Sequence, residues 1–202
     1  GKIVLFIVLS PVIGMVLGSI NMVAAAWLVR RQTPARVDRW FRHLQLLSAA
    51  IFSYSHGTND AQKVMGIIAV VLYGTVWAGQ PFQVPVWVVF LCHAAIGLGT
   101  FFGGWRIVKT MGNRLTKLQP IHGFCAETGG GVTILALAEL GIPVSTTHTI
   151  TGAIVGVGST RGARAVRWGM AGRIVWAWVF TIPAAALVAG AAAIVLRAVV
   201  LR

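Results

Sequence analysis

Acidic side chains are rare in this sequence. Its 202 residues contain 4 Asp and Glu against 17 Lys and Arg, which gives a formal net charge of +13, and only 10% of the residues are charged. A soluble domain normally has about 25% charged residues. Because 57% of the chain is hydrophobic and the mean hydropathy is +0.82, the composition excludes an ordinary soluble domain and indicates an integral membrane protein.

Cysteine is also scarce, and both cysteines, Cys92 and Cys125, lie in apolar runs without the spacing of a metal site. We therefore expect neither a disulfide nor a zinc site, and we interpret both as small buried side chains. The basic residues form short clusters between apolar stretches, which favours positive-inside topology over nucleic-acid binding. These features predict a multi-pass protein of a cell membrane, such as the bacterial inner membrane, in contact with lipid and without metal, cofactor or nucleic-acid partner.

Long apolar stretches predict the helices that cross the membrane. At 1.5 Å per residue, about 20 residues cross the ~30 Å hydrocarbon core. Basic groups within 30–42, 109–117 and 161–173 mark the cytoplasmic side, and an uncharged turn at 79–85 marks the other side. We expect one transmembrane domain over residues 1–202, with the all-α fold of a polytopic membrane helix bundle. Its continuous spans are expected at residues 3–29, 86–105 and 174–196.

A polar stretch interrupts the apolar residues at 53–63, where the sequence is Ser-Tyr-Ser-His-Gly-Thr-Asn-Asp-Ala-Gln-Lys. Asp60 alone costs about 2.5 to 3.5 kcal/mol at the membrane centre on insertion scales, and Gly57 weakens a helix. We therefore expect the helix over 43–77 to be broken here, with the break turned toward protein or water. The second half-helix would begin at 58–60, and its free N–H groups would form an anion site.

A second unusual region covers residues 120–158. Glu127 is an acid inside an apolar stretch, and the three glycines at 129–131 would let helices approach closely. Turn residues at 141–143, followed by hydroxyl residues at 145–147, predict two short helices joined as a re-entrant or helical hairpin. Acids inside membranes are usually functional, so Glu127 joins Asp60 as a candidate functional residue.

Two motifs resemble one known family. Residues 55–61, Ser-His-Gly-Thr-Asn-Asp-Ala, resemble the Gly-x-Asn-Asp signature of the inorganic phosphate transporter (PiT) family, and residues 143–148, Pro-Val-Ser-Thr-Thr-His, resemble its Pro-x-Ser-Thr-Thr-His segment. The similarity extends over residues 36–158. Because family members contain two inverted halves and this chain has one copy of each motif, the resemblance implies the C-terminal half of an inverted-repeat transporter. Its expected partner is the missing N-terminal half or a second copy in a homo-oligomer.

The resemblance also implies a secondary transporter, not an enzyme, that moves inorganic phosphate by symport with sodium or protons. Amide, hydroxyl and imidazole groups can donate to an anion, whereas an ionised carboxylate cannot. We therefore assign Asp60 and Glu127 to the coupling ion. We expect the Asn59–Asp60 segment to converge with the helix start at 145–147 near the membrane midplane. The candidate substrate-binding residues are Asn59, Ser145, Thr146, Thr147 and His148.

Three alternatives stay open at this point. Sulfate or another oxyanion would suit the same fold, because nothing in the sequence separates two tetrahedral oxyanions. A membrane metalloenzyme would use His56, Asp60, Glu127 and His148, although the sequence lacks a compact ligand motif such as His-Glu-x-x-His. A non-transporting membrane subunit would use the Ser and Thr residues only for helix capping and interhelical hydrogen bonds, and His148 for packing.

Overall fold

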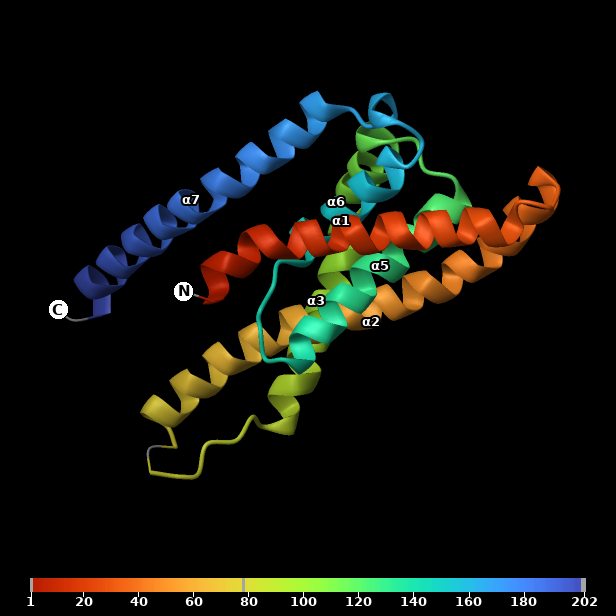
Figure 1. Ribbon diagram of the computed structural model, residues 1–202. Helices are drawn as coiled ribbons and strands as arrows, with labels where there is room; N and C mark the ends of the chain where they lie inside the picture. The colour runs from red at the N-terminus through yellow and green to blue at the C-terminus, as the bar shows by residue number, and fades with distance from the viewer. Residues whose placement is uncertain (1, 78, 201–202) are drawn as a thin grey trace. The chain divides into compact units, whose positions relative to one another are not determined.

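The computed structural model describes residues 2–77 and 79–200, and residues 1, 78, 201 and 202 lie outside the described part. The chain divides into two compact units, residues 1–166 and 167–202. The regular elements of the described residues, shown in Figure 1, are α1 (Lys2–Val29), α2 (Pro34–Thr75), α3 (Val86–Gly103), α4 (Trp105–Lys109), the π-helix η1 (Thr110–Leu115), α5 (Pro120–Glu139), α6 (Thr146–Ser159), the 3-10 helix η2 (Ala163–Ala165) and α7 (Trp168–Val200).

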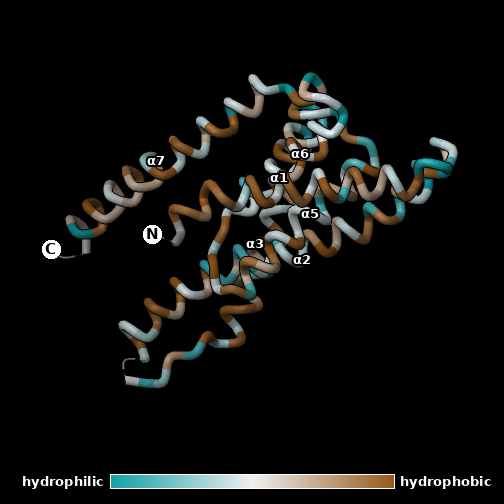
Figure 2. Tube along the Cα trace, viewed as in Figure 1, coloured by the Kyte–Doolittle hydropathy of each residue, from teal (hydrophilic) through white to brown (hydrophobic). Residues whose placement is uncertain are grey.

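The second unit consists of the long apolar helix α7. It extends past both ends of the predicted span at 174–196, and Pro183 lies inside it without ending it. Four helices of the described part, α1, α3, α5 and α7, are long and apolar enough to cross a membrane. Figure 2 shows hydrophobic colours along α1 and α7 and hydrophilic colours where α1 turns into α2. The prediction of an all-α polytopic membrane protein is therefore confirmed.

Helix α5 is the central helix of the first unit and contacts α1, α2 and α6. The glycines at 129–131 make these contacts close. A methyl group on Gly129 would come within 2.7 Å of the Gly18 nitrogen in α1, and a methyl group on Gly131 would lie 3.6 Å from the Ser55 hydroxyl in α2. The three glycines thus let α5 approach its neighbours, as the sequence predicted.

Helices α1 and α6 each contribute a Gly-x-x-x-Gly motif to their contact. The motif in α1 is Gly14 and Gly18, and the motif in α6 is Gly152 and Gly156. A methyl group on Gly152 would collide with the carbonyl of Pro11 in α1. Small residues at such positions let helix backbones pack closely, and this packing is a main source of helix association in lipid. Pro11 itself does not interrupt α1, which continues to Val29.

The predicted break near Gly57 is wrong, because α2 runs continuously from Pro34 to Thr75. A glycine inside a helix costs only about 1 kcal/mol relative to alanine, and opening the helix would leave backbone groups without partners in lipid. The polar side chains are instead satisfied along α2 and by the segment that connects α5 to α6. The helix therefore accommodates its polar residues without a break.

The predicted hairpin of two helices is confirmed, and the helical backbone is interrupted at its turn and not in α2. Helix α5 ends at Glu139 and α6 begins at Thr146, with Gly141 at a φ of +66° that favours glycine. The first helix is not short as expected: its 20 residues reach about 30 Å, whereas the 14 residues of α6 reach only about 21 Å. Helix α6 begins at a buried residue, Thr146.

Beyond the polar stretch, α2 packs against α3. Ala61 and Met65 form a buried apolar cluster with Val88 and Cys92. Cys125 is buried as well, so both cysteines are small buried side chains, as predicted. The span expected at 86–105 ends slightly earlier, at Gly103, where the backbone turns before α4.

We expect Gly152→Ala to lower the free energy of unfolding by about 1 to 3 kcal/mol, the usual cost of overpacking, because the added methyl group meets the Pro11 carbonyl. The matched control is Gly66→Ala in α2, where nothing lies within 4 Å of the added group. The control should be neutral or slightly stabilising. Unfolding in detergent measures both, and equal effects of the two substitutions would contradict the close α1–α6 packing.

Candidate functional site

The carboxylate of Asp60 is the centre of a polar cluster between α2 and the start of α6. Its Oδ1 accepts hydrogen bonds from the Asn59 amide and the Lys63 ammonium, each at 3.0 Å. Its Oδ2 lies 2.9 Å from His56 Nε2 and accepts a hydrogen bond from the Thr146 hydroxyl at 3.2 Å. Two donors on each oxygen explain how an apolar helix can carry this carboxylate.

The backbone carbonyl of Val144 is the second acceptor in this cluster. It receives hydrogen bonds from Lys63 Nζ at 2.7 Å and from Asn59 Nδ2 at 3.0 Å. Both donors therefore bridge the same two atoms, Asp60 Oδ1 and Val144 O, which we call the Asp60–Val144 oxygen pair. The pair joins α2 to the α5–α6 connection across more than 80 positions of sequence.

The local structure of the hairpin explains why the Val144 carbonyl is available. The residues from 142 to 145 are not helical, so this carbonyl has no partner inside a helix. Ser145 is the N-cap of α6, and its hydroxyl accepts a hydrogen bond from the His148 backbone N–H at 3.4 Å. Val144 itself is buried. Both side chains that donate to its carbonyl, Asn59 and Lys63, belong to α2.

One side of the cluster is accessible. The side chains of His56, Asp60 and Lys63 are 35%, 33% and 37% exposed, whereas Asn59 and Thr146 are buried. A small anion or cation that approaches from this side would meet the ammonium, the imidazole and the carboxylate. The buried amide and hydroxyl hold the carboxylate from behind.

The predicted convergence of Asn59 and Asp60 with the start of α6 is confirmed by these hydrogen bonds. Thr146 is part of the cluster, while Ser145 caps the helix from its N-terminus. Thr147 is exposed, and its backbone carbonyl accepts a hydrogen bond within α6.

His148 lies on another side of α6. Its side chain hydrogen-bonds to the backbone of Ile7 in α1. The predicted substrate-binding set is therefore only partly brought together. His148 has a contact of the kind expected for a packing residue.

Glu127 lies apart from the cluster. It accepts a short hydrogen bond of 2.6 Å from the Ser48 hydroxyl, and the Gln45 side chain contacts it as well. Ser48 and Asp60 are 12 positions apart on one continuous helix, a rise of about 18 Å. The two predicted coupling acids are thus held by different parts of α2.

The metalloenzyme alternative finds no support in this geometry. Among residues 2–77 and 79–200, no group of three or more His, Cys, Asp or Glu side chains is placed to hold a metal ion. Of the four proposed ligands, His56 and Asp60 are adjacent, but Glu127 contacts Ser48 and His148 contacts Ile7.

The predicted site residues do not include Lys63 or the Val144 carbonyl, and the sequence offers His56 only as a candidate metal ligand. The signal for the two side chains was their spacing, because in a continuous helix positions four before and three after Asp60 lie on the same face. Because a break was expected at Gly57, residues 56 and 60 were not expected to lie on one continuous helix. No sequence signal singles out the carbonyl.

The fold is shared with a solved membrane transporter. The structure of a protein described as "The sodium-dependent phosphate transporter" matches 98% of this chain and 66% of that chain, with a TM-score of 0.81 and 24% sequence identity. The class defined by the fold is therefore a polytopic membrane protein with a helical hairpin beside a long continuous helix.

Sequence comparison identifies the family. Residues 1–189 match the phosphate transporter family, and the chain belongs to this family. It is 62% identical over 182 residues to a "Probable low-affinity inorganic phosphate transporter" of Rhizobium meliloti, covering 90% of this chain and 54% of the relative. A protein of the same description from Bacillus subtilis is 39% identical over 196 residues, covering 97% and 59%. The chain thus spans a little over half the length of these relatives, and the family is one of transporters rather than enzymes.

Proposed function

We propose that this chain forms the part of a secondary transporter that binds inorganic phosphate and couples its movement to a cation. The observation that carries this proposal is the Asp60 cluster, in which one accessible carboxylate lies among an ammonium, an imidazole, an amide and a hydroxyl. The names of the two relatives, both inorganic phosphate transporters, support phosphate as the substrate. The proposed setting is a cell membrane, and bacterial relatives favour an inner membrane.

The anion would bind to donors that already surround Asp60. The ammonium of Lys63 has three N–H donors. Two of them bond to Asp60 Oδ1 and Val144 O, so the third can donate to a phosphate oxygen on the accessible side of the cluster. The first turn of α6 adds backbone N–H groups and the positive end of a helix dipole. Lys63, and His56 when protonated, offset the repulsion that Asp60 alone would exert on phosphate.

The position of Lys63 favours protons over sodium as the coupling ion. Sodium binds to oxygen ligands such as carboxylates and backbone carbonyls, and the Asp60–Val144 oxygen pair is a group of this kind. The Lys63 ammonium already lies between the two oxygens, at 3.0 Å and 2.7 Å. An internal cation therefore holds the place that sodium would need, and the adjacent His56 can both accept and donate a proton.

A further region of the protein would complete the site. The accessible side of the cluster offers too few donors to replace the hydration of a phosphate ion, and burial of unpaired charge is costly. The chain spans 54% and 59% of two relatives. We therefore propose that the transporting unit contains a second region, an N-terminal half or a second copy of this chain. The full transporter is the protein to use in transport experiments.

In the full transporter, we expect Asp60→Asn to lower gradient-driven phosphate uptake about tenfold or more, because the neutral amide removes the charge that holds the coupling cation; a tenfold change corresponds to about 1.4 kcal/mol. Uptake of labelled phosphate into proteoliposomes measures this effect. Glu139→Gln is the matched control, because Glu139 is an exposed acid outside the cluster. Uptake by the Asp60 variant equal to that of the control would reject the proposed site, and competition by sulfate would show whether the substrate is phosphate alone.

A second experiment addresses the coupling ion. We expect uptake by the unmodified transporter to follow a pH gradient and to be unchanged when sodium is replaced by choline. Lys63→Ser should free the Asp60–Val144 oxygen pair and make the remaining uptake increase with sodium. Gln62→Ser, at the exposed neighbouring position, should behave as the unmodified protein. Sodium-dependent uptake before any substitution would contradict the role of Lys63 while leaving phosphate transport intact.

A further inference from the structure

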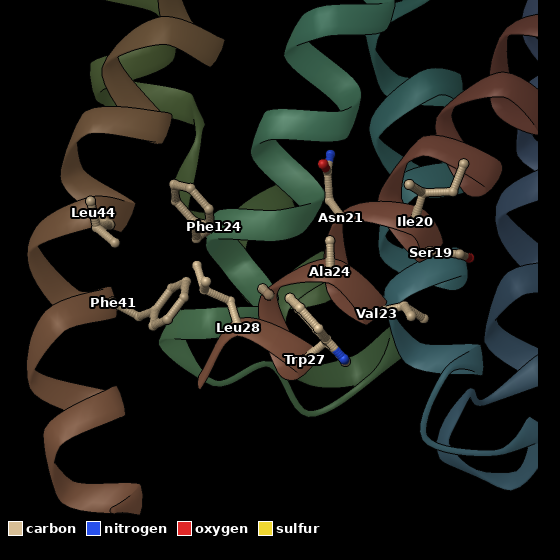
Figure 3. A pocket seen from close by; sticks show the side chains of 11 residues that line it. Ser19, Ile20, Asn21, Val23, Ala24, Trp27, Leu28, Phe41, Leu44 and Phe124 are labelled. Carbon is tan, nitrogen blue, oxygen red and sulfur yellow. The ribbon is translucent and has the colours of Figure 1, made fainter. Parts of the chain in front are cut away.

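A wide apolar groove lies between α1, α2 and α5, away from the Asp60 cluster. Its volume is about 1020 Å³. The rings of Phe41 and Phe124 pack edge to face behind it, with centroids 5.3 Å apart, and Figure 3 shows Trp27 and Leu28 beside Phe41 at one end. Most of its lining comes from the α1 segment 19–28.

The dimensions of the groove match an acyl chain. The α1 segment from Ser19 to Leu28 rises about 14 Å, which is close to half of the ~30 Å hydrocarbon core and therefore to one leaflet. Ile20, Val23 and Leu28 are 56%, 60% and 76% exposed in this chain. The groove thus presents apolar side chains along the depth of a single leaflet.

Positive charge gathers at the end of the groove where α1 stops. The guanidinium of Arg30 lies over the Trp27 ring, 5.0 Å from its centroid, so a cation sits directly on a residue that lines the groove. Residues 30–42 contain five arginines and one acid, Asp38. That acid pairs with Arg42 at 2.8 Å, which leaves a strong excess of positive charge at this end.

We propose that the groove binds an acyl chain of an anionic phospholipid from the leaflet on the basic side, with the lipid phosphate against Arg30 and Arg31. Basic pockets beside membrane helices attract anionic headgroups, and the apolar lining fits the lipid tail. A zwitterionic phospholipid such as phosphatidylcholine would gain the apolar contact, but the ammonium of its headgroup would offset the attraction between its phosphate and the arginines. A protein segment would need polar partners for its own backbone unless it were a complete helix.

Native mass spectrometry of the full transporter, delipidated in detergent, tests the proposal. The probes are phosphatidylglycerol and phosphatidylcholine with identical acyl chains. We expect phosphatidylglycerol to bind more tightly, and Arg30→Gln and Arg31→Gln each to weaken its binding about fivefold. Arg164→Gln, which removes an exposed charge that does not line the groove, is the matched control and should change binding little.

A groove variant separates the tail contact from the charge contact. Ala24→Phe fills the groove at an exposed position of α1, so it should weaken the binding of both lipids while the protein stays folded. Equal binding of the two lipids, or equal effects of Arg164→Gln and Arg30→Gln, would overturn the proposal. So would unchanged binding to the Ala24 variant, or the absence of bound lipid, which would indicate that protein covers the groove.

Discussion

One backbone carbonyl and one side-chain carboxylate share the same two hydrogen-bond donors, and the rest of the candidate site depends on this arrangement. Val144 O and Asp60 Oδ1 are both contacted by Asn59 and Lys63. This shared contact compensates a charge inside an apolar helix and fixes the hairpin to α2 at the same point. If these donors were absent, the carbonyl of the buried residue Val144 would lose both of its partners, and Asp60 would keep only the His56 and Thr146 contacts on Oδ2, at a cost of several kcal/mol.

Close helix packing makes these short hydrogen bonds geometrically possible. The glycines at 129–131 bring α5 against α1 and α2, and Gly152 and Gly156 bring α6 against α1. Larger residues at 152 and 156 would collide with the Pro11 and Met15 carbonyls of α1 and shift α6, and with it the Thr146 hydroxyl that bonds to Asp60 at 3.2 Å. The small residues therefore contribute to the site although none of them touches it.

Much of the fold and part of the site could be predicted from the sequence. Apolar length located α1, α3 and α7, and the turn residues before Ser145 located the hairpin. The break at Gly57 was predicted wrongly, because Asp60 finds three partners on its own helix, and a segment more than 80 positions away adds the Val144 carbonyl and the Thr146 hydroxyl. Local sequence could not show that Lys63 bridges two oxygens, nor that Glu127 is bound to Ser48 instead of joining Asp60.

The central claim is that phosphate binds where α2 meets the start of α6. Arsenate has the shape and charge of phosphate, and arsenic can be located directly by anomalous X-ray scattering. The most direct test is therefore a crystal structure of the full transporter with arsenate. The account predicts an arsenic peak on the accessible side of the Asp60 cluster, with an arsenate oxygen within hydrogen-bond distance of Lys63 Nζ. A peak only at the basic residues 109–117 or 161–164, with the Asp60 cluster unoccupied, would contradict it.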